Sequence, residues 1–346
     1  MSSGNGPTYP RFPRSLIHPL GPIFRHLPLS LRRHLLFLHH QGAWGNFRQP
    51  DGFAEKMQWR ILNDHRALMA WTADKLAQKS YAAHVRANDE NAKSLKIPAT
   101  FWAGTEAEDL ARHAGALPSD WVFKPNHSCG RFRIYGNTDN SSADPDWNEI
   151  ADIARQWMAP DEEIKVFGHF AYGRARRLLI AEERVGSVGN PPIDVRILCF
   201  DGRSHSAFSV IGHIGDPGWS AAYLDGSLNR IRAGLIGSSE LGLEEQHPID
   251  QIRPAIKEEI LRVAQSLAAP FDFVRVDLYV SENEIWLGEL TTYSGSGLRK
   301  VDATLDTERG KAWRLPNLAA SDPRESEWRA LLTTAPELSL PKPKNV

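Results

Sequence analysis

Two carboxylates and an arginine near the end of the chain have the types and spacing of a cation site. They stand in FDFVRVDLYVSENEIWLGELTTYSGSG, residues 271–297. Side chains alternate along a strand, so Arg275 and Asp277 should share one face. If residues 281–283 form a three-residue turn, Glu289 lies opposite Arg275 and diagonal to Asp277. Carboxylate oxygens placed in this way suit a hard divalent cation, with positions left for phosphate.

A loop rich in hydroxyls and glycine follows the same hairpin. Thr291 comes two residues after Glu289, and residues 294–297 read Ser-Gly-Ser-Gly. Backbone N–H groups and hydroxyls of such a loop bind carboxylate or phosphate oxygens. The alternative is an Arg275–Glu289 ion pair on a solvated sheet face, which would contribute little to stability. The hairpin alone leaves both interpretations open.

One lysine lies at the end of a predicted strand, and two others share a face of a predicted helix. Lys124 ends an apolar strand over residues 121–124, directly before the loop 126–130. Lys75 and Lys79 share one face of a helix predicted over 72–85. An ammonium group on a fixed stem binds phosphate as a point charge. The alternative for Lys124 is a surface position with its apolar stem packed on the protein. By themselves, Lys75 and Lys79 are an ordinary solvated pair.

A third segment combines an apolar strand with acidic residues. The sequence LLIAEERVG, residues 178–186, turns polar at Glu182 and Glu183. Such a strand can bind an adenine through its backbone and a ribose through a carboxylate, or it can simply end at the surface. Asp194 and Arg196 share one face of the next predicted strand.

Hydrophobic periodicity predicts alternating helices and strand pairs around these residues. Helices are predicted at 53–61, 72–85, 148–158 and 252–267, and strands at 121–124, 131–135, 178–182, 193–200, 206–211, 271–280 and 284–291. Because consecutive strands are mostly joined by short turns, the pattern is typical of an α+β fold.

The composition limits the class of protein. The chain has 346 residues, with 41 Lys+Arg against 42 Asp+Glu, and its formal net charge is −1. This balance argues against a nucleic-acid partner. No run of 18 apolar residues is present, so no transmembrane helix is predicted. The two cysteines form no disulfide framework, which favours a reducing, cytoplasmic compartment.

The first 50 residues differ from the rest. They contain six arginines and no acidic residue, which gives a charge of +6, and six prolines precede residue 29. One interpretation is a basic arm on the protein's own surface. The other is peripheral contact with an anionic membrane or polymer. The last residues, 303–346, are predicted to be a poorly ordered tail.

Six segments in this order resemble the TupA-like branch of the ATP-grasp family: PDGFAEKMQWRILND, ADKLAQKSY, WVFKPNHSCG, LLIAEERV, DVRILCFDG and the hairpin above. The resemblance covers residues 46–302 and implies an ATP-grasp fold in which two α+β subdomains grip ATP. By position, residues 72–185 would be the nucleotide-gripping subdomain and 186–302 the metal and substrate subdomain. A basic arm (1–45) would precede them and the tail (303–346) would follow.

The resemblance also implies a carboxylate–amine ligase that uses ATP and Mg²⁺, forms an acylphosphate, and acts in cell-surface polysaccharide synthesis. It implies the following site residues. Lys75 and Lys124 would contact phosphate, with His127, Ser128 and Gly130 in the phosphate loop. Glu182, Glu183 and Val185 would bind adenine and ribose, and Arg196 would also bind the nucleotide. Arg275 and Lys124 would be catalytic, Asp277, Glu289 and Thr291 would bind magnesium, and Ser294, Ser296 and Gly297 would hold the substrate carboxylate.

Two positions depart from the family pattern. Ser128 and Cys129 stand where the phosphate loop is usually richer in glycine, and Thr291 stands where many ATP-grasp enzymes have asparagine. Two other functions therefore stay open. One is a catalytically weak nucleotide-binding scaffold of a polysaccharide assembly complex. The other is a metal-dependent glycosyltransferase, which the lack of a compact DxD motif disfavours.

Overall fold

The computed structural model describes residues 24, 26–136, 145–159, 166–187, 189–211, 220–232 and 246–333. The helices are α3 (Leu29–Gln41), α4 (Phe53–Asn63), α5 (Ala67–Thr72), α6 (Lys75–Asn88), α7 (Ala107–Arg112), α8 (Trp147–Met158), α10 (Pro254–Ala268), α11 (Ala303–Ala312) and α12 (Glu325–Thr333). The strands are β1 (Leu95–Lys96), β2 (Thr100–Gly104), β3 (Trp121–Pro125), β4 (Arg133–Tyr135), β5 (Leu179–Glu183), β6 (Ile193–Phe200), β7 (Arg203–Ile211), β8 (Ser220–Asp225), β9 (Phe273–Ser281) and β10 (Glu284–Thr291).

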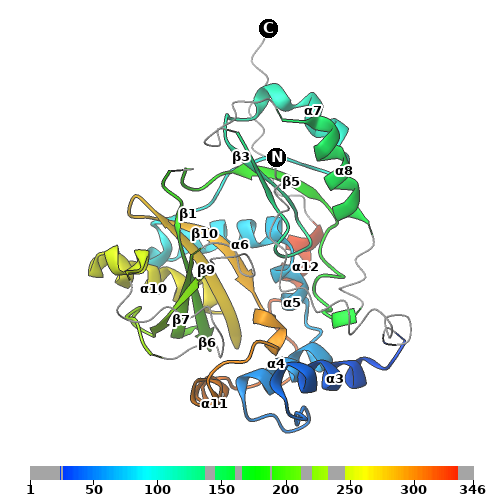
Figure 1. Cartoon of the computed structure of the whole chain (residues 1–346), viewed down its shortest axis with the longest axis vertical. Helices are drawn as coiled ribbons and strands as arrows, with labels where there is room; N and C mark the ends of the chain where they lie inside the picture. The colour runs from blue at the N-terminus through cyan, green and yellow to red at the C-terminus, as the bar shows by residue number, and fades with distance from the viewer. Residues whose placement is uncertain are drawn as a thin grey trace.

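Two sheets organise the described part of the chain (Figure 1). The larger has the order β1-β10-β9-β6-β7-β8, and the smaller has the order β2-β5-β3-β4. Within the described residues, every strand pair is antiparallel except β1 with β10. This arrangement confirms the α+β class, and each predicted helix and strand overlaps an observed one. The helix predicted over 72–85 begins at Lys75 instead, because residues 67–72 form a helix of their own.

The two faces of the larger sheet have opposite characters. Val276 and Leu278 of β9 point to one face, are buried, and pack on α10, whose apolar stripe includes Ile260 and Val263. The alternate residues of β9, such as Arg275, point to the other face. One face therefore stabilises the fold through apolar burial, and the other is free to carry polar side chains.

The smaller sheet has its own apolar core. Trp121 and Phe123 of β3 pack with Ile150 and Trp157 of α8, and helix α7 covers the same cluster. Figure 1 shows this sheet and its helices as a separate layer above the larger sheet. Helix α6 and strand β1 contact β10 of the larger sheet. The division of the chain at residues 72 and 186 stays a prediction.

The described residues before α4 are part of the folded body. Leu36 and Phe37 of α3 are buried against Phe47 and Leu298, and Arg33 is fully buried. Residues 1–23 and 25 of the predicted basic arm lie outside the described residues. In the part of the chain that is described, no helix is long and apolar enough to cross a membrane.

The prediction that the chain ends in a tail is wrong for residues 303–333. These residues form α11 and α12, which pack on α4 and α5. Trp313 is fully buried and Trp328 nearly so, and both belong to the main apolar cluster. Two isolated tryptophans in a polar sequence give no periodic signal, which explains the error. Residues 334–346 lie outside the described part.

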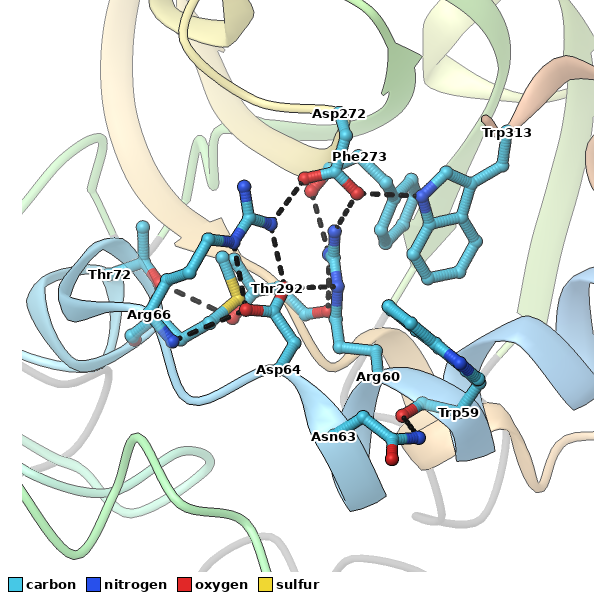
Figure 2. A network of polar contacts seen from close by, with 11 residues as sticks. Trp59, Arg60, Asn63, Asp64, Arg66, Thr72, Asp272, Phe273, Thr292 and Trp313 are labelled. Atoms are coloured by element: carbon cyan, nitrogen blue, oxygen red, sulfur yellow. Dashed lines mark hydrogen bonds and ion pairs between the residues drawn. The ribbon is translucent and has the colours of Figure 1, made fainter. Parts of the chain in front are cut away.

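A buried network of charges joins α4, β9 and the C-terminal segment (Figure 2). Arg60 forms an ion pair with Asp272 and donates to the carbonyl oxygen of Phe273 at 2.9 Å. Arg66 donates to Asp272 at 2.7 Å, and the indole of Trp313 donates to the same carboxylate at 2.8 Å. The start of β9 is thereby fixed to two segments that are distant in sequence.

Replacing Asp272 by Asn should lower the free energy of unfolding by about 3 kcal/mol, because the buried Arg60 would lose its closest anion and keep only the 3.6 Å ion pair with Asp64. Urea denaturation at pH 7 measures the change. Although burial opposes the shift, Arg60 and Arg66 lower the pKa of Asp272. The stability difference should therefore be complete above the unfolded-state pKa of about 3.9 and shrink as the pH falls below it.

The matched control is Asp201→Asn. Asp201 pairs at 2.8 Å with Arg314, whose side chain is 82% exposed, so this change should alter stability by only about 0–1 kcal/mol. Equal effects of the two substitutions would show that the buried network does not stabilise β9.

Candidate functional site

A change of register in β10 brings two carboxylates together. Before Gly288, Leu287 lies opposite Leu278 on the apolar face. After it, Glu289 lies opposite Asp277 on the polar face. A bulge inserts one extra residue and so reverses the faces of the side chains that follow. An added Cβ at Gly288 would lie 2.8 Å from the carbonyl oxygen of Asp277, so the backbones approach too closely for a larger residue.

The predicted register of this hairpin was wrong in detail. The turn has two residues, Glu282 and Asn283, both with positive φ, instead of three. Arg275 consequently lies opposite Thr291, and Glu289 lies directly opposite Asp277 instead of diagonal to it. The error came from the shorter turn and from the bulge, which shift the register by one residue each, and the observed register brings the two carboxylates closer than expected.

Asp277 orients Arg275. Nε and Nη2 of Arg275 donate to the two oxygens of Asp277, each at 2.6 Å. Nη2 also reaches the hydroxyl of Thr291 at 3.1 Å, and Nη1 lies 3.4 Å from that of Ser294. Burial raises the pKa of Asp277, and the Arg275 guanidinium opposes that shift. The bidentate pair fixes the plane of the guanidinium.

Arg196 extends the same row of charged groups into β6. It lies opposite Asp277, and its Nε is 4.0 Å from the Asp277 carboxylate. Its closest partner is Asp194, to which Nη2 donates at 2.7 Å. The Arg196 side chain is therefore held at the polar face by two carboxylates.

Lys75 joins the smaller sheet's loop to this face. Asp74 caps α6 by accepting from the backbone N–H of Ala77, so the helix begins at Lys75 and not at residue 72 as predicted. The Lys75 ammonium donates to the carbonyl oxygen of Ser128 and lies 3.8 Å from a Glu289 oxygen. The predicted phosphate loop and the predicted metal ligands therefore lie side by side.

Lys124 and Lys79 share one carboxylate. Glu182 of β5 forms ion pairs with Lys124 through one oxygen and with Lys79, at 2.6 Å, through the other. Although burial opposes the shift, the two ammonium groups lower the pKa of Glu182 to about 2. Glu182 thus holds both lysines in place.

The loop after β3 is packed against α6. Asn126 accepts from the backbone N–H of Leu76 at 2.9 Å and donates to the carbonyl oxygen of Arg176 at 2.9 Å. His127 is fully buried, and burial together with nearby cations lowers its pKa to about 4. The ring is therefore neutral at pH 7, and the positive charge near it comes from Arg177 and Lys75.

The Ser-Gly-Ser-Gly segment forms a short turn with three successive left-handed residues. Gly295, Ser296 and Gly297 have φ of 55°, 57° and 62°. The carbonyl oxygen of Ser296 accepts from Arg33 at 2.8 Å, and its hydroxyl lies 2.8 Å from the His169 ring. Ser294, Gly295 and Gly297 line a cavity beside Arg275, whereas Ser296 is turned toward α3.

Three predicted site residues are not joined to this cluster by a described contact. Glu183 accepts from the backbone N–H of Ala99 at the sheet edge. Val185 is half-buried, and Gly130 follows the loop with φ of 65°. Their predicted roles toward a nucleotide stay predictions.

Sequence reasoning missed two residues that shape the site. Lys79 was paired with Lys75 by its helical spacing but was not assigned to the site. Gln78 was not identified, although its side chain binds both the N–H and the carbonyl oxygen of Leu290, at 2.8 and 3.2 Å. A glutamine that binds a distant strand has no local signal.

The sequence profile of the TupA-like ATPgrasp family matches residues 55–313. No curated protein matches the sequence significantly. Similar solved structures include a D-alanine–D-alanine ligase from Bacillus anthracis complexed with ATP, with 12% identity, a TM-score of 0.34, and coverage of 64% of this chain and 53% of that chain. VanG D-Ala:D-Ser ligase from Enterococcus faecalis has 11% identity, a TM-score of 0.36 and coverage of 64% and 52%.

ATP-grasp ligase PsnB, complexed with minimal precursor, Mg and ADP, has 14% identity, a TM-score of 0.36 and coverage of 75% and 66%. The chain thus spans between about half and two thirds of the length of these structures.

Replacing Gly288 by Ala should lower the free energy of unfolding by about 1–3 kcal/mol, because the added methyl group would overlap the Asp277 carbonyl. Urea denaturation measures this change. Gly115→Ala is the control, because no atom lies within 4 Å of a Cβ at that position. A Gly288→Ala protein as stable as the control would contradict the close approach of the two strands.

Proposed function

The chain belongs to the TupA-like ATP-grasp family, and from that premise we propose that it is a carboxylate–amine ligase that uses ATP and Mg²⁺. In this reaction ATP phosphorylates a carboxylate, an amine displaces phosphate from the acylphosphate, and an amide forms. One observation carries the proposal. Lys75, Arg275 and the Asp277–Glu289 pair meet at one face of the larger sheet.

The cations at this face suit a polyphosphate. Lys124 and Lys75 come from the smaller sheet and the start of α6, and each ammonium is positioned by an acceptor, Glu182 or the Ser128 carbonyl. Phosphoryl transfer depends on alignment and charge neutralisation more than on covalent help from the protein. We assign the two lysines to ATP binding, with Lys124 also acting on the transferring group.

Arg275 is assigned to the transferring phosphoryl group. Its guanidinium is fixed in one plane by Asp277 and lies beside Ser294 of the glycine-rich turn. A rigid, always-charged fork can bind two oxygens at once. We assign Ser294 and Gly297 to the carboxylate substrate, which would then lie next to the γ-phosphate, and we leave out Ser296, because it does not line the cavity.

Asp277 and Glu289 fit a magnesium ion. The Glu289 side chain is 24% exposed and its only described ion pair is the 3.8 Å contact with Lys75, so its oxygens remain accessible. An ionised carboxylate has about four acceptor positions, so Asp277 can bind Arg275 and still offer a lone pair. Thr291 adds a hydroxyl. Bound Mg²⁺ would neutralise charge on the phosphate oxygens.

No cluster of three or more His, Cys, Asp or Glu side chains with metal-site geometry occurs among the described residues. The protein would therefore supply few of the magnesium ligands, and phosphate oxygens would complete the set. Such sharing is typical of Mg²⁺ in nucleotide sites.

For the biological setting we propose cell-surface polysaccharide synthesis by a cytoplasmic enzyme that contacts an anionic membrane through residues 1–50. The charge of +6 in this segment supports the contact. Arg32 and Arg33 already bind carbonyl oxygens of the protein, so the contact would fall to the other four arginines.

ATP·Mg²⁺ should raise the melting temperature of the protein. At 100 times its dissociation constant, a ligand adds about 2.7 kcal/mol to the stability of the folded state. Differential scanning fluorimetry with ATP, with and without Mg²⁺, measures the shift, and UDP-glucose is the comparison ligand. A shift with UDP-glucose and none with ATP would favour the glycosyltransferase alternative.

Glu289→Gln should slow ADP release by about 10³–10⁵-fold, because it keeps the shape of the side chain but loses the charge that binds the cation. ADP release and trapping of the acylphosphate by hydroxylamine measure the effect with candidate carboxylates and amines. Glu284→Gln is the matched control on the same strand, since its partner Lys96 lies at an exposed edge. If Glu289→Gln retained normal ADP release, the metal assignment would be wrong.

A further inference from the structure

Arg309 of α11 is a buried cation with an incomplete set of partners. Only 4% of the residue is exposed. Its Nε donates to the hydroxyl of Ser206 at 3.1 Å, but its buried Nη2 has no hydrogen-bond partner among the described residues. A buried charged donor that lacks an acceptor destabilises the fold, so its presence requires an explanation.

The register of the sheet places Arg309 at the polar face. Ser206 lies opposite Leu198, and Leu198 lies opposite Arg275. Residues paired across neighbouring strands share a face. Arg309 therefore reaches, from α11, the same face that carries Arg275 and Asp277.

A cavity of about 50 Å³ lies between these groups, and it widens to about 530 Å³ when its solvent-filled mouth is included. Its lining contains the arginines Arg275, Arg299 and Arg309 and, among the described residues, one acidic side chain, Asp306. The Asp306 carboxylate accepts from the backbone N–H of Ala54 at 2.9 Å. With three arginines and one aspartate, the lining of the cavity has a net positive charge.

Two further properties define what the cavity can hold. Phe53, Phe208 and Tyr223 provide aromatic walls suited to a carbon skeleton or a ring. Burial lowers the pKa of Arg309 to about 10, so the guanidinium is still charged at neutral pH. An anion is therefore the group that would complete its hydrogen bonds.

We infer that this cavity binds a substrate with two acidic groups, one reacting beside Arg275 and Ser294 and the other, a carboxylate, bound by Arg309. The inference rests on the proposed function, which places the reacting carboxylate at Arg275. If the inference holds, the substrate is an acid with a second carboxylate, such as an acidic amino acid or a sugar diacid. A monocarboxylic acid would leave Nη2 of Arg309 without a partner.

Calorimetric titration of the full chain, loaded with Mg²⁺ and a non-hydrolysable ATP analogue, tests the inference. The probes are succinate, L-glutamate and galactarate, each compared with its neutral or mono-amide counterpart. The wild type should bind at least one diacid about tenfold or more tightly than its amide. Arg309→Met should abolish that preference, and Arg309→Lys should keep part of it, because a point charge cannot bind a carboxylate bidentately.

Stability distinguishes this role from a structural one. Replacing a buried cation whose hydrogen bonds are incomplete by an apolar side chain of similar length is often neutral or stabilising. The melting temperature of Arg309→Met should therefore equal or exceed that of the wild type. A fall in melting temperature with no change in diacid preference would overturn the inference. Arg314→Met is the control, since Arg314 is 82% exposed just after α11 and should alter neither property.

Absence of any diacid preference in the wild type would also overturn the inference. Failure of the proposed function has a different signature, because ATP·Mg²⁺ would then cause no thermal shift in any variant. A protein that responds to ATP but whose Arg309→Met variant binds diacids like the wild type would refute the Arg309 site and leave the ligase proposal intact.

Discussion

One extra residue in β10 decides which side chains face the polar side of the larger sheet. Up to Leu287 the strand contributes apolar side chains to the face covered by α10, and from Glu289 onward it contributes polar ones to the opposite face. A strand without the bulge would send Glu289 to the apolar face. The close backbone contact at Gly288 is therefore the constraint on which the carboxylate pair depends.

The segment after the bulge is fixed from outside the sheet. Gln78 binds both backbone groups of Leu290, and Arg60 donates to the carbonyl oxygen of Thr292 at 3.3 Å. The hydroxyls of Thr72 and Thr292 lie 3.3 Å apart. These contacts come from α4 to α6, so helices early in the chain determine how the end of β10 enters the site.

Local patterns in the sequence predicted the elements and the residue types of the site, but not its register. Alternation along β9 correctly placed Arg275 and Asp277 on one face. The bulge was not predicted, because a glycine within a strand is compatible with either a regular or a bulged pairing. Arg309 was missed for a related reason. Helix α11 has no clear apolar stripe. Its position depends on contacts with α4, a helix that lies about 250 residues earlier in the chain.

The N-terminal helix explains how a strained turn can persist at the site. Ser296 has a positive φ, which is unfavourable for a residue with a side chain and is sustained only when surrounding contacts outweigh it. Arg33 and Gln58 donate to its carbonyl oxygen at 2.8 and 3.0 Å, and His169 contacts its hydroxyl. None of these three residues is among those that line the cavity beside Arg275. The basic N-terminal segment therefore does more than cover the surface, because its buried arginine holds the turn in the conformation that leaves Ser294 and the two glycines facing the cavity.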